Sequence, residues 1–169
     1  MPAGNTYESI AIATASGSTN TVTFSSIPST YTDLVLVTTI RSTGSSFSQT
    51  RIRFNGDSGS NYSGTVLLGN GSAASSYRET NATEMLVAYD ALSSNPSGFF
   101  SPTIINIMNY ANTTTNKTLL ARNSNALGNA MADVFMWRST AAINSVSIIT
   151  ANANFDAGST FSLYGIASA

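Results

Sequence analysis

Eight carboxylates are the main side chains of this sequence that could carry out acid-base chemistry. The chain has no His, no Cys and a single lysine, Lys117. His titrates near neutral pH, and Cys and Lys supply the nucleophiles that proteins activate most readily. A Ser-His-Asp or Cys-His catalytic site is therefore excluded, and so is a zinc site made of His and Cys.

A pair of carboxylates is the first chemistry that this composition permits, because two of them can hydrolyse a glycosidic bond. The two carboxyl groups must lie about 5 to 10 Å apart, which the sequence does not establish. The candidates are Glu8, Asp33, Asp57, Glu79, Glu84, Asp90, Asp133 and Asp156. A carboxylate hydrolase stays open as an alternative, but we predict a protein that is not an enzyme.

A hard-cation site is the second possibility, at the oxygen-rich turn between residues 55 and 61. Asn55, Asp57 and Asn61 alternate there with Gly and Ser and could wrap Ca²⁺. The turn lacks the acidic density and the terminal Glu of an EF-hand loop. We therefore favour a glycine-rich hairpin whose Asn and Asp side chains bond their own backbone, and we predict neither a metal nor a cofactor.

Aromatic side chains and arginines are what the sequence offers for contacts with a partner. Tyr31, Tyr62 and Trp137 could supply area and ring stacking at a protein or glycan site, although most aromatics of a β domain lie in its core. Arg51 and Arg53 fall on one face of a predicted strand, where they could clamp a carboxylate across a subunit boundary or remain solvated. These five residues are the candidate interface.

The chain is poor in charge, with 9% charged residues and a formal net charge of −1. Ser, Thr and Asn together make up about two-fifths of it. Neutral polar groups cost less to bury against a partner than ions do, so this composition suits a permanent interface. The seven cations are scattered, which argues against a nucleic-acid partner. We also expect no secretory signal and no membrane span, because no apolar stretch approaches about 20 residues.

Short apolar-alternating runs separated by turn residues recur along the chain, which is typical of an antiparallel sandwich. We predict an all-β fold with a single domain over residues 1–169, an antiparallel β-sandwich and more narrowly a jelly roll, with residues 1–5 as a contact arm. The predicted strands are Tyr7–Thr14, Thr21–Phe24, Asp33–Arg41, Arg51–Phe54, Tyr62–Leu68, Glu84–Asp90, Thr103–Tyr110, Lys117–Arg122, Val134–Arg138, Ser145–Thr150 and Thr160–Ile166.

The segment between the fifth predicted strand and the sixth permits more than one local structure. Gly71–Thr83 is rich in Ser and Ala and is predicted to be a long loop. Asn81-Ala82-Thr83-Glu84 has the character of a capping box, which would start a short helix. The alternation of Met85, Val87 and Tyr89 favours a strand over that helix.

Two runs are apolar on both faces of their predicted strands. Leu34–Val37 indicates a central strand, or one covered by another layer or subunit. Val134–Trp137 has the same character, for which we favour the core and keep a subunit interface as the alternative. Pro28 cannot donate to a sheet ladder and is expected to mark a bend between two strands, while Asn55-Gly56 supplies the positive φ of a tight turn.

Several strings of the sequence, in this order and spacing, resemble a group of small virion proteins of tailed phages, particularly those of cyanobacteria and other aquatic bacteria. They reach from the first predicted strand to the last. The strings are Tyr7–Ile10, Thr23–Leu34, Arg53–Ser63, Trp137–Ile143 and Gly158–Ile166.

The resemblance implies a compact β-sandwich or jelly roll on the outside of a virion, with no catalytic residues. It fits both a capsid decoration protein and a tail-fibre or receptor-binding module that recognises host glycans. The absence of a fibrous repeat or coiled-coil stalk favours the capsid. We therefore expect a decoration protein on the outer capsid surface, a homotrimer that binds the major capsid protein.

Overall fold

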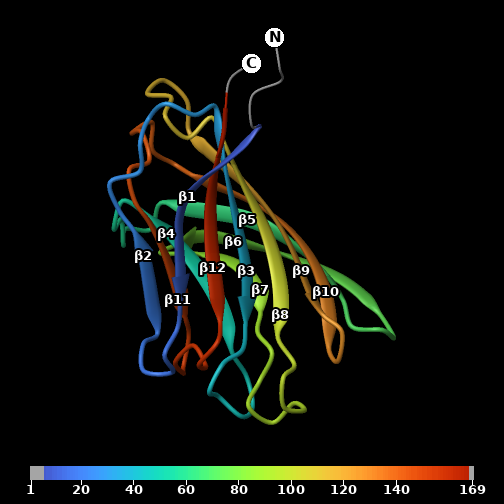
Figure 1. Ribbon diagram of the computed structural model, residues 1–169. Helices are drawn as coiled ribbons and strands as arrows, with labels where there is room; N and C mark the ends of the chain where they lie inside the picture. The colour runs from blue at the N-terminus through green and yellow to red at the C-terminus, as the bar shows by residue number, and fades with distance from the viewer. Residues whose placement is uncertain (1–5, 168–169) are drawn as a thin grey trace.

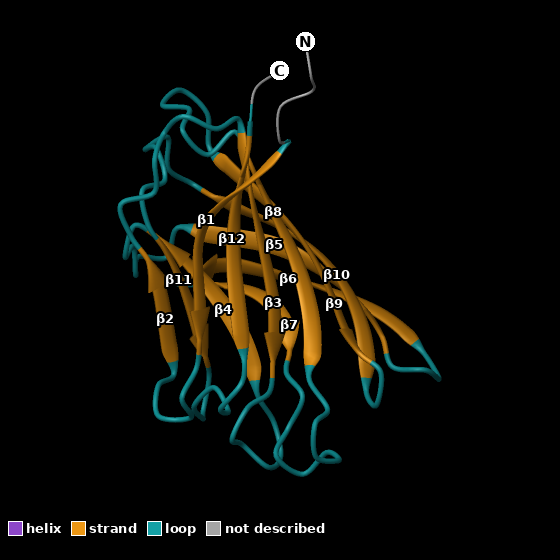
Figure 2. Ribbon diagram, viewed as in Figure 1, coloured by secondary structure: helices purple, strands orange, loops and turns teal. Residues whose placement is uncertain are grey.

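The computed structural model describes residues 6–167, which form two antiparallel β-sheets packed as a sandwich (Figures 1 and 2). This confirms the predicted all-β antiparallel sandwich. Within residues 6–167, no helix is long and apolar enough to cross a membrane. The strands are β1 (Tyr7–Thr14), β2 (Thr21–Phe24), β3 (Asp33–Ile40), β4 (Gln49–Phe54), β5 (Tyr62–Gly69), β6 (Ala74–Ala82), β7 (Met85–Tyr89), β8 (Ser101–Met108), β9 (Lys117–Asn125), β10 (Asn129–Trp137), β11 (Val146–Thr150) and β12 (Thr160–Ile166).

The strand order explains the unequal size of the two sheets. The larger sheet has eight strands in the order β1-β12-β3-β8-β9-β10-β5-β6, and the smaller has four in the order β2-β11-β4-β7. When the hairpins β5-β6 and β9-β10 are set aside, two four-stranded sheets remain, β1-β12-β3-β8 and β2-β11-β4-β7. That arrangement is compatible with the predicted jelly roll. The two hairpins pair with each other through β10 and β5 and extend the larger sheet.

The core lies between the two sheets, where every second side chain of the larger sheet points inward. Ile105 of β8, Leu119 of β9 and Phe135 of β10 are almost completely buried on this inner face. Strand β7 packs against the same region from the smaller sheet, and its residues Met85–Ala88 are buried on both sides. The choice of a strand over a short helix in this segment is therefore confirmed.

The prediction of a long loop over Gly71–Thr83 is wrong. Ala74–Ala82 form β6, which pairs along β5 from Gly69↔Ala74 to Tyr62↔Ala82. Nearly all side chains of β6 are exposed, because it is the edge strand of the larger sheet. An edge strand without a buried face shows no hydrophobic alternation, so its backbone pairing left no signal in the sequence.

The two runs that are apolar on both faces have different surroundings. Strand β3 lies between β12 and β8, and Leu34, Val35 and Leu36 are all buried, which confirms a central strand. In β10, Phe135 and Trp137 point into the core, but Val134 and Met136 are exposed on the other face. The core interpretation is therefore correct for only half of that run.

The predicted turns are present. Asn55 and Gly56 have φ values of 51° and 67°, as a tight hairpin turn requires. Pro28 lies between β2 and β3, where the chain passes from the smaller sheet to the larger. The proposed contact arm, residues 1–5, lies outside the described residues.

Candidate interaction surface

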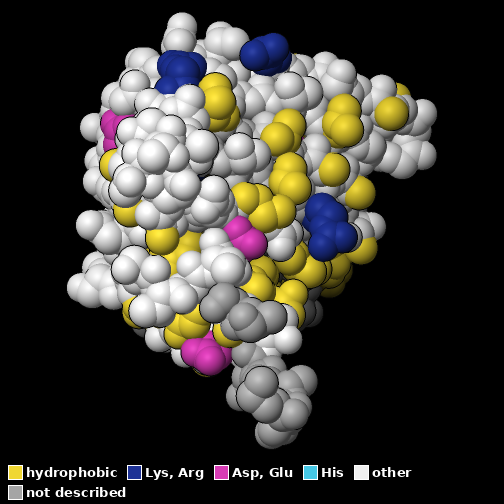
Figure 3. Space-filling view, turned by 90° about the horizontal axis from the view of Figure 1, so that it is seen from above, with side chains coloured by type: hydrophobic (Ala, Val, Ile, Leu, Met, Phe, Trp, Pro, Cys, Tyr) yellow, Lys and Arg dark blue, Asp and Glu magenta, His cyan; other side chains and the backbone are white. Residues whose placement is uncertain are grey.

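Exposed apolar side chains gather on the outer face of the larger sheet, over β8, β9, β10 and β5. We call this surface the apolar half of the outer face. Between 37% and 54% of each side chain's surface is accessible. Hydrophobic side chains collect on the side of the molecule where β9 and β10 lie (Figure 3). The residues of the apolar half are Ile104, Met108, Leu120, Val134, Met136 and Leu67.

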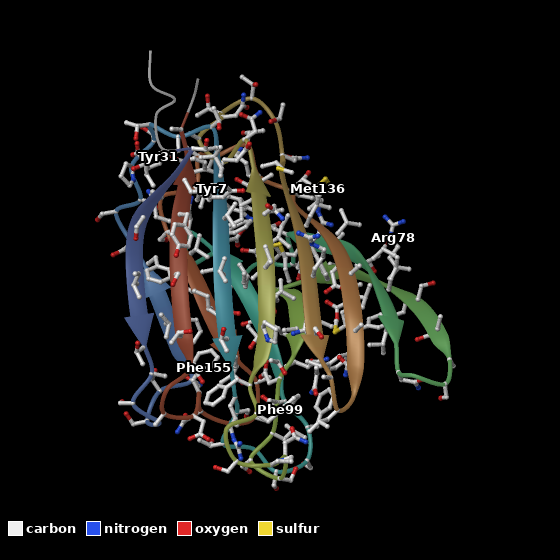
Figure 4. All side chains as sticks on the ribbon, turned by 45° about the vertical axis from the view of Figure 1, so that its right-hand side comes forward. Tyr7, Tyr31, Arg78, Phe99, Met136 and Phe155 are labelled. Atoms are coloured by element: carbon white, nitrogen blue, oxygen red, sulfur yellow. The ribbon has the colours of Figure 1, made fainter. Side chains whose placement is uncertain are left out.

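The register of the sheet makes this surface contiguous. Leu120 of β9 lies directly opposite Val134 of β10, and Met108 of β8 lies opposite Thr118 of β9, which in turn faces Met136. Side chains of paired residues on one face are close enough to touch. Strands β8, β9 and β10 are seen face-on in Figure 4, with Met136 near one end of the surface.

A shallow depression of about 420 Å³ lies within the apolar half. Leu67, Leu120 and Val134 line it, and Asn106 and Arg122 supply polar groups beside them. A flat apolar surface with a few polar groups around it has the composition of the core of a protein–protein interface. The geometry suits contact with a broad surface better than enclosure of a small ligand.

The remainder of the same outer face, over β1, β12 and β3, is different. We call it the hydroxyl half. Thr14, Thr160 and Thr39 form one cross-strand row, and Ser162 lies beside Val37 in the next. Its large exposed apolar side chains, Tyr7 and Ile12, both belong to the edge strand β1.

The two arginines predicted at an interface are paired within the chain. Arg51 donates to both carboxylate oxygens of Glu79 on β6 at 3.3 Å, and Arg53 donates to Glu84 at 2.5 Å. The arginines do share a face and do bind carboxylates. Those carboxylates belong to the same chain, however, because β6 and the β6–β7 turn lie beside β4. The clamp therefore joins the edge of the larger sheet to the smaller sheet.

Two of the three aromatic candidates are core residues, which corrects the prediction that they face a partner. Tyr62 and Trp137 are 0% and 3% exposed, and their rings stack with centroids 6.4 Å apart. Trp137 takes an inward position of the β10 alternation, so it faces the smaller sheet. The third candidate, Tyr31, is half-buried, and its ring packs against Gly165.

The oxygen-rich turn is held by hydrogen bonds within the chain, as the hairpin interpretation predicts. Asn55 accepts bonds from the backbone N–H groups of Asn144 and Ser145 at 2.9 and 3.1 Å. The Asp57 carboxylate accepts from the Gly59 backbone, the Asn61 amide and Trp137 Nε1 at 2.8, 2.9 and 2.6 Å. Burial raises the pKa of Asp57, but the bonds from Trp137 and Asn61 outweigh it and lower the pKa overall.

The candidate cation ligands are thus occupied by donors of the chain rather than gathered around one point. Asn55 fastens the turn to the segment before β11, and Asp57 fastens it to β10. Among residues 6–167, no group of three or more acidic, His or Cys side chains is placed to hold a metal ion. The hydrogen bonds of Asn55 and Asp57 hold the turn in its hairpin conformation.

Most other carboxylates are also bound by groups of the chain. Asp156 pairs with Arg41 at 3.2 Å, and Asp33 accepts a bond from the Asn109 backbone. Asp90 is buried and accepts bonds from the hydroxyls of Ser48, Thr50 and Thr150. Its burial nevertheless raises its pKa.

Asp133 is the exception. It lies on the inner side of β10, is 4% exposed, and both of its carboxylate oxygens are buried without a hydrogen-bond partner among the described residues. Burial, and next the negative charge of Glu79, raise the pKa of Asp133 to about 7. Two of the candidate carboxylates are thus electrostatically coupled, as the pair of a hydrolase would be. Glu79 is held by Arg51, however, and Asp133 is covered, so the two do not face an open cleft.

Lys117 has a structural setting that the sequence did not indicate. It is fully buried at the start of β9, and its ammonium group donates to the backbone carbonyls of Thr115 and Thr140 at 2.7 and 3.1 Å. Burial lowers its pKa. The lysine therefore ties the start of β9 to the segment after β10.

Apart from Val134 and Met136, the residues of the apolar half were not predicted from the sequence to form an interaction surface. A signal was present, since Ile104-Ile105 and Leu119-Leu120 place apolar side chains on both faces of their strands. No protein-family model matches the chain, and no curated protein matches it.

Proposed function

We propose that this protein is a non-enzymatic virion structural protein, a capsid decoration protein that binds the outer surface of the capsid through its apolar half. The observation that carries the proposal is the contiguous exposed apolar surface over β8, β9, β10 and β5. Burying such a surface against a partner is favourable, by roughly 25 cal/mol per Å² of apolar area before the costs of association.

The surroundings of the apolar half support a permanent contact. Asn106 and Thr118 are neutral, and the charged side chains beside the apolar rows are Arg122 and Arg78. A neutral polar group loses less on leaving water than an ion does, so little of the hydrophobic gain is cancelled. The placement on a capsid rests on the resemblance to virion proteins of tailed phages.

Self-association is the second part of the proposal. A homotrimer would present three apolar halves to the major capsid protein and so gain avidity without stronger single contacts. The outer edges of the larger sheet, β1 and β6, are the places where copies would meet, because an edge strand offers unpaired backbone groups.

Two cross-strand residues at the centre of the surface provide the test. Leu120→Thr and Val134→Thr together would give the apolar half the character of the hydroxyl half. We expect wild-type protein to bind purified particles that lack it and to raise the temperature at which they release DNA. The double variant should bind at least about tenfold more weakly, as measured by co-sedimentation.

Ile12→Thr is the matched control, because Ile12 is exposed on β1 outside the apolar half. This variant should bind and stabilise particles as the wild type does. Equal binding by the double variant, or particles whose heat resistance does not depend on the protein, would contradict the proposal. Density for the chain on the tail instead of the head would favour a receptor-binding module.

A further inference from the structure

A second surface feature lies at one end of the sandwich, away from the apolar half. Loops from four parts of the chain meet there and enclose a cleft of about 320 Å³. It is lined by the β3–β4 loop at Phe47, the end of β7 at Tyr89, the β7–β8 loop at Asn95 and the β9–β10 turn. These loops lie at the end of the sandwich opposite the start of β1 (Figure 1). The volume is in the range of sites for small ligands, about 300 to 1,000 Å³.

One wall of the cleft is an exposed aromatic ring with a fixed orientation. Phe47 is 51% exposed, and its ring centroid lies 5.6 Å from that of Tyr89, with the rings tilted by 58°. Leu127, which is 56% exposed, adds apolar surface from the β9–β10 turn. An aromatic ring braced by a second one gives a ligand contact area at little entropic cost.

Asn95 and Asn129 bring amide side chains to the lining of the cleft. Asn129 Oδ1 is buried and has no hydrogen-bond partner among residues 6–167. Asn95 uses its Oδ1 to accept the Leu92 backbone N–H at 2.7 Å, which leaves its NH₂ group as a donor. An unpaired buried acceptor costs free energy that a ligand hydroxyl would recover. Both side chains line the cleft next to an apolar ring, and rotation of the Asn129 amide would bring its unpaired oxygen to a ligand.

The cleft also offers no positive charge. No Lys or Arg is among its lining residues, so a phosphate or carboxylate would find no cation there. The acidic residue in the lining is Asp90, whose carboxylate is already bound by three hydroxyls. A suitable ligand has uncharged hydroxyl groups and an apolar ring face, which is the chemistry of a neutral sugar.

We propose that this cleft binds a neutral saccharide, which packs one face against Phe47 and hydrogen-bonds to Asn95 and Asn129. The site shares no residue with the apolar half, so it goes beyond the proposed function and does not depend on it. The three aromatic candidates of the sequence, Tyr31, Tyr62 and Trp137, take no part in it.

Saturation-transfer NMR on the full chain tests the site with defined probes. The panel holds maltotriose, cellotriose, mannotriose and triacetylchitotriose as neutral trisaccharides, and sialyllactose as an acidic one. We expect transfer to at least one neutral trisaccharide and none to sialyllactose. Absence of transfer to all four neutral probes, or a signal from sialyllactose alone, overturns the proposal.

Two variants place the binding in the cleft. Phe47→Ala removes an exposed ring, and Asn129→Ala removes an acceptor that has no partner among residues 6–167, so both should remain folded by circular dichroism. Each should weaken binding at least about tenfold. Tyr7→Ala removes an equally exposed aromatic on β1 and should change nothing. Undiminished binding in folded Phe47→Ala and Asn129→Ala proteins would also overturn the proposal.

Discussion

The apolar and hydroxyl halves of the outer face belong to one sheet, yet they differ in the side chains they present. Over β12 the outward positions are exposed Thr160 and half-buried Ser162 and Tyr164, which alternate with buried Phe161 and Leu163. Over β9 and β10 the exposed positions are largely apolar as well. Both halves cover the same kind of core, so the requirements of folding do not explain the difference.

The apolar half lies mostly on strands that extend the larger sheet. Three of its four strands, β5, β9 and β10, belong to the hairpins that extend the larger sheet beyond the arrangement compatible with a jelly roll. The hydroxyl half lies entirely on the other strands. The added hairpins therefore carry core residues on their inner face and most of the exposed apolar side chains on their outer face.

Truncation of the two neighbouring leucines of β9 should give the largest contrast. Leu119→Ala empties a fully buried site and should lower the free energy of unfolding by about 2 to 5 kcal/mol. Leu120→Ala, on the exposed side, should change it by about 0.5 kcal/mol or less. Equilibrium urea unfolding measures both. Similar losses for the two variants would mean that the outer face is covered in the isolated protein.

The buried carboxylate beneath the apolar half should make stability depend on pH. The pKa of Asp133 is about 7 in the folded state, above the value of about 3.9 expected when unfolded. Between these values the folded state holds the proton and the unfolded state does not, so stability falls as pH rises. We expect the free energy of unfolding to be about 1 to 3 kcal/mol higher at pH 5 than at pH 8.

Asp133→Asn should remove most of the dependence of stability on pH. It should also stabilise the protein at pH 8, since an amide leaves no charge to bury. Part of the dependence should remain, because burial also raises the pKa of Asp90. Thr160→Ala, which removes no ionisable group from an exposed position of β12, is the control and should leave the pH profile unchanged. An unaltered profile in Asp133→Asn would assign the dependence to other groups.

The ion pair that joins β6 to β4 should contribute less. Glu79→Gln breaks the contact with Arg51, which is partly exposed, so the loss should be about 0.2 to 1 kcal/mol. The same change removes the charge that raises the pKa of Asp133, and that pKa should fall. Carboxyl-carbon NMR titration measures it.

Glu84→Gln separates the two effects of that substitution. It breaks the corresponding pair with Arg53, yet Glu84 is not among the groups that raise the pKa of Asp133. It should therefore give a similar small loss of stability with no change in the Asp133 titration. A shift of that titration in Glu84→Gln would show that the charge of Glu79 is not the specific cause.

The smallest effect is expected on the hydroxyl half. Thr160→Ala removes an exposed hydroxyl and should alter the free energy of unfolding by less than about 0.5 kcal/mol. Binding to particles, measured by co-sedimentation, should stay at the wild-type level. Loss of binding in this variant would show that the contact surface extends across the whole outer face.

The sequence by itself determined the local structure of this protein. Alternation in β4, where Ile52 and Phe54 are buried and Arg51 and Arg53 are not, marked a strand with one face in the core. Asn55-Gly56 determined a tight turn, since both residues adopt positive φ. These features depend on neighbours in the chain, and so did the prediction of an antiparallel sandwich.

The tertiary structure decided everything that depends on which distant strands become neighbours. Strand β6 exists because β5 offers it a backbone to pair with, and Glu79 meets Arg51 only through that pairing. The cleft at Phe47 combines loops separated by up to about eighty residues. Leu119 and Leu120 are identical in type, and only the packing of the smaller sheet buries the first and leaves the second free for a partner.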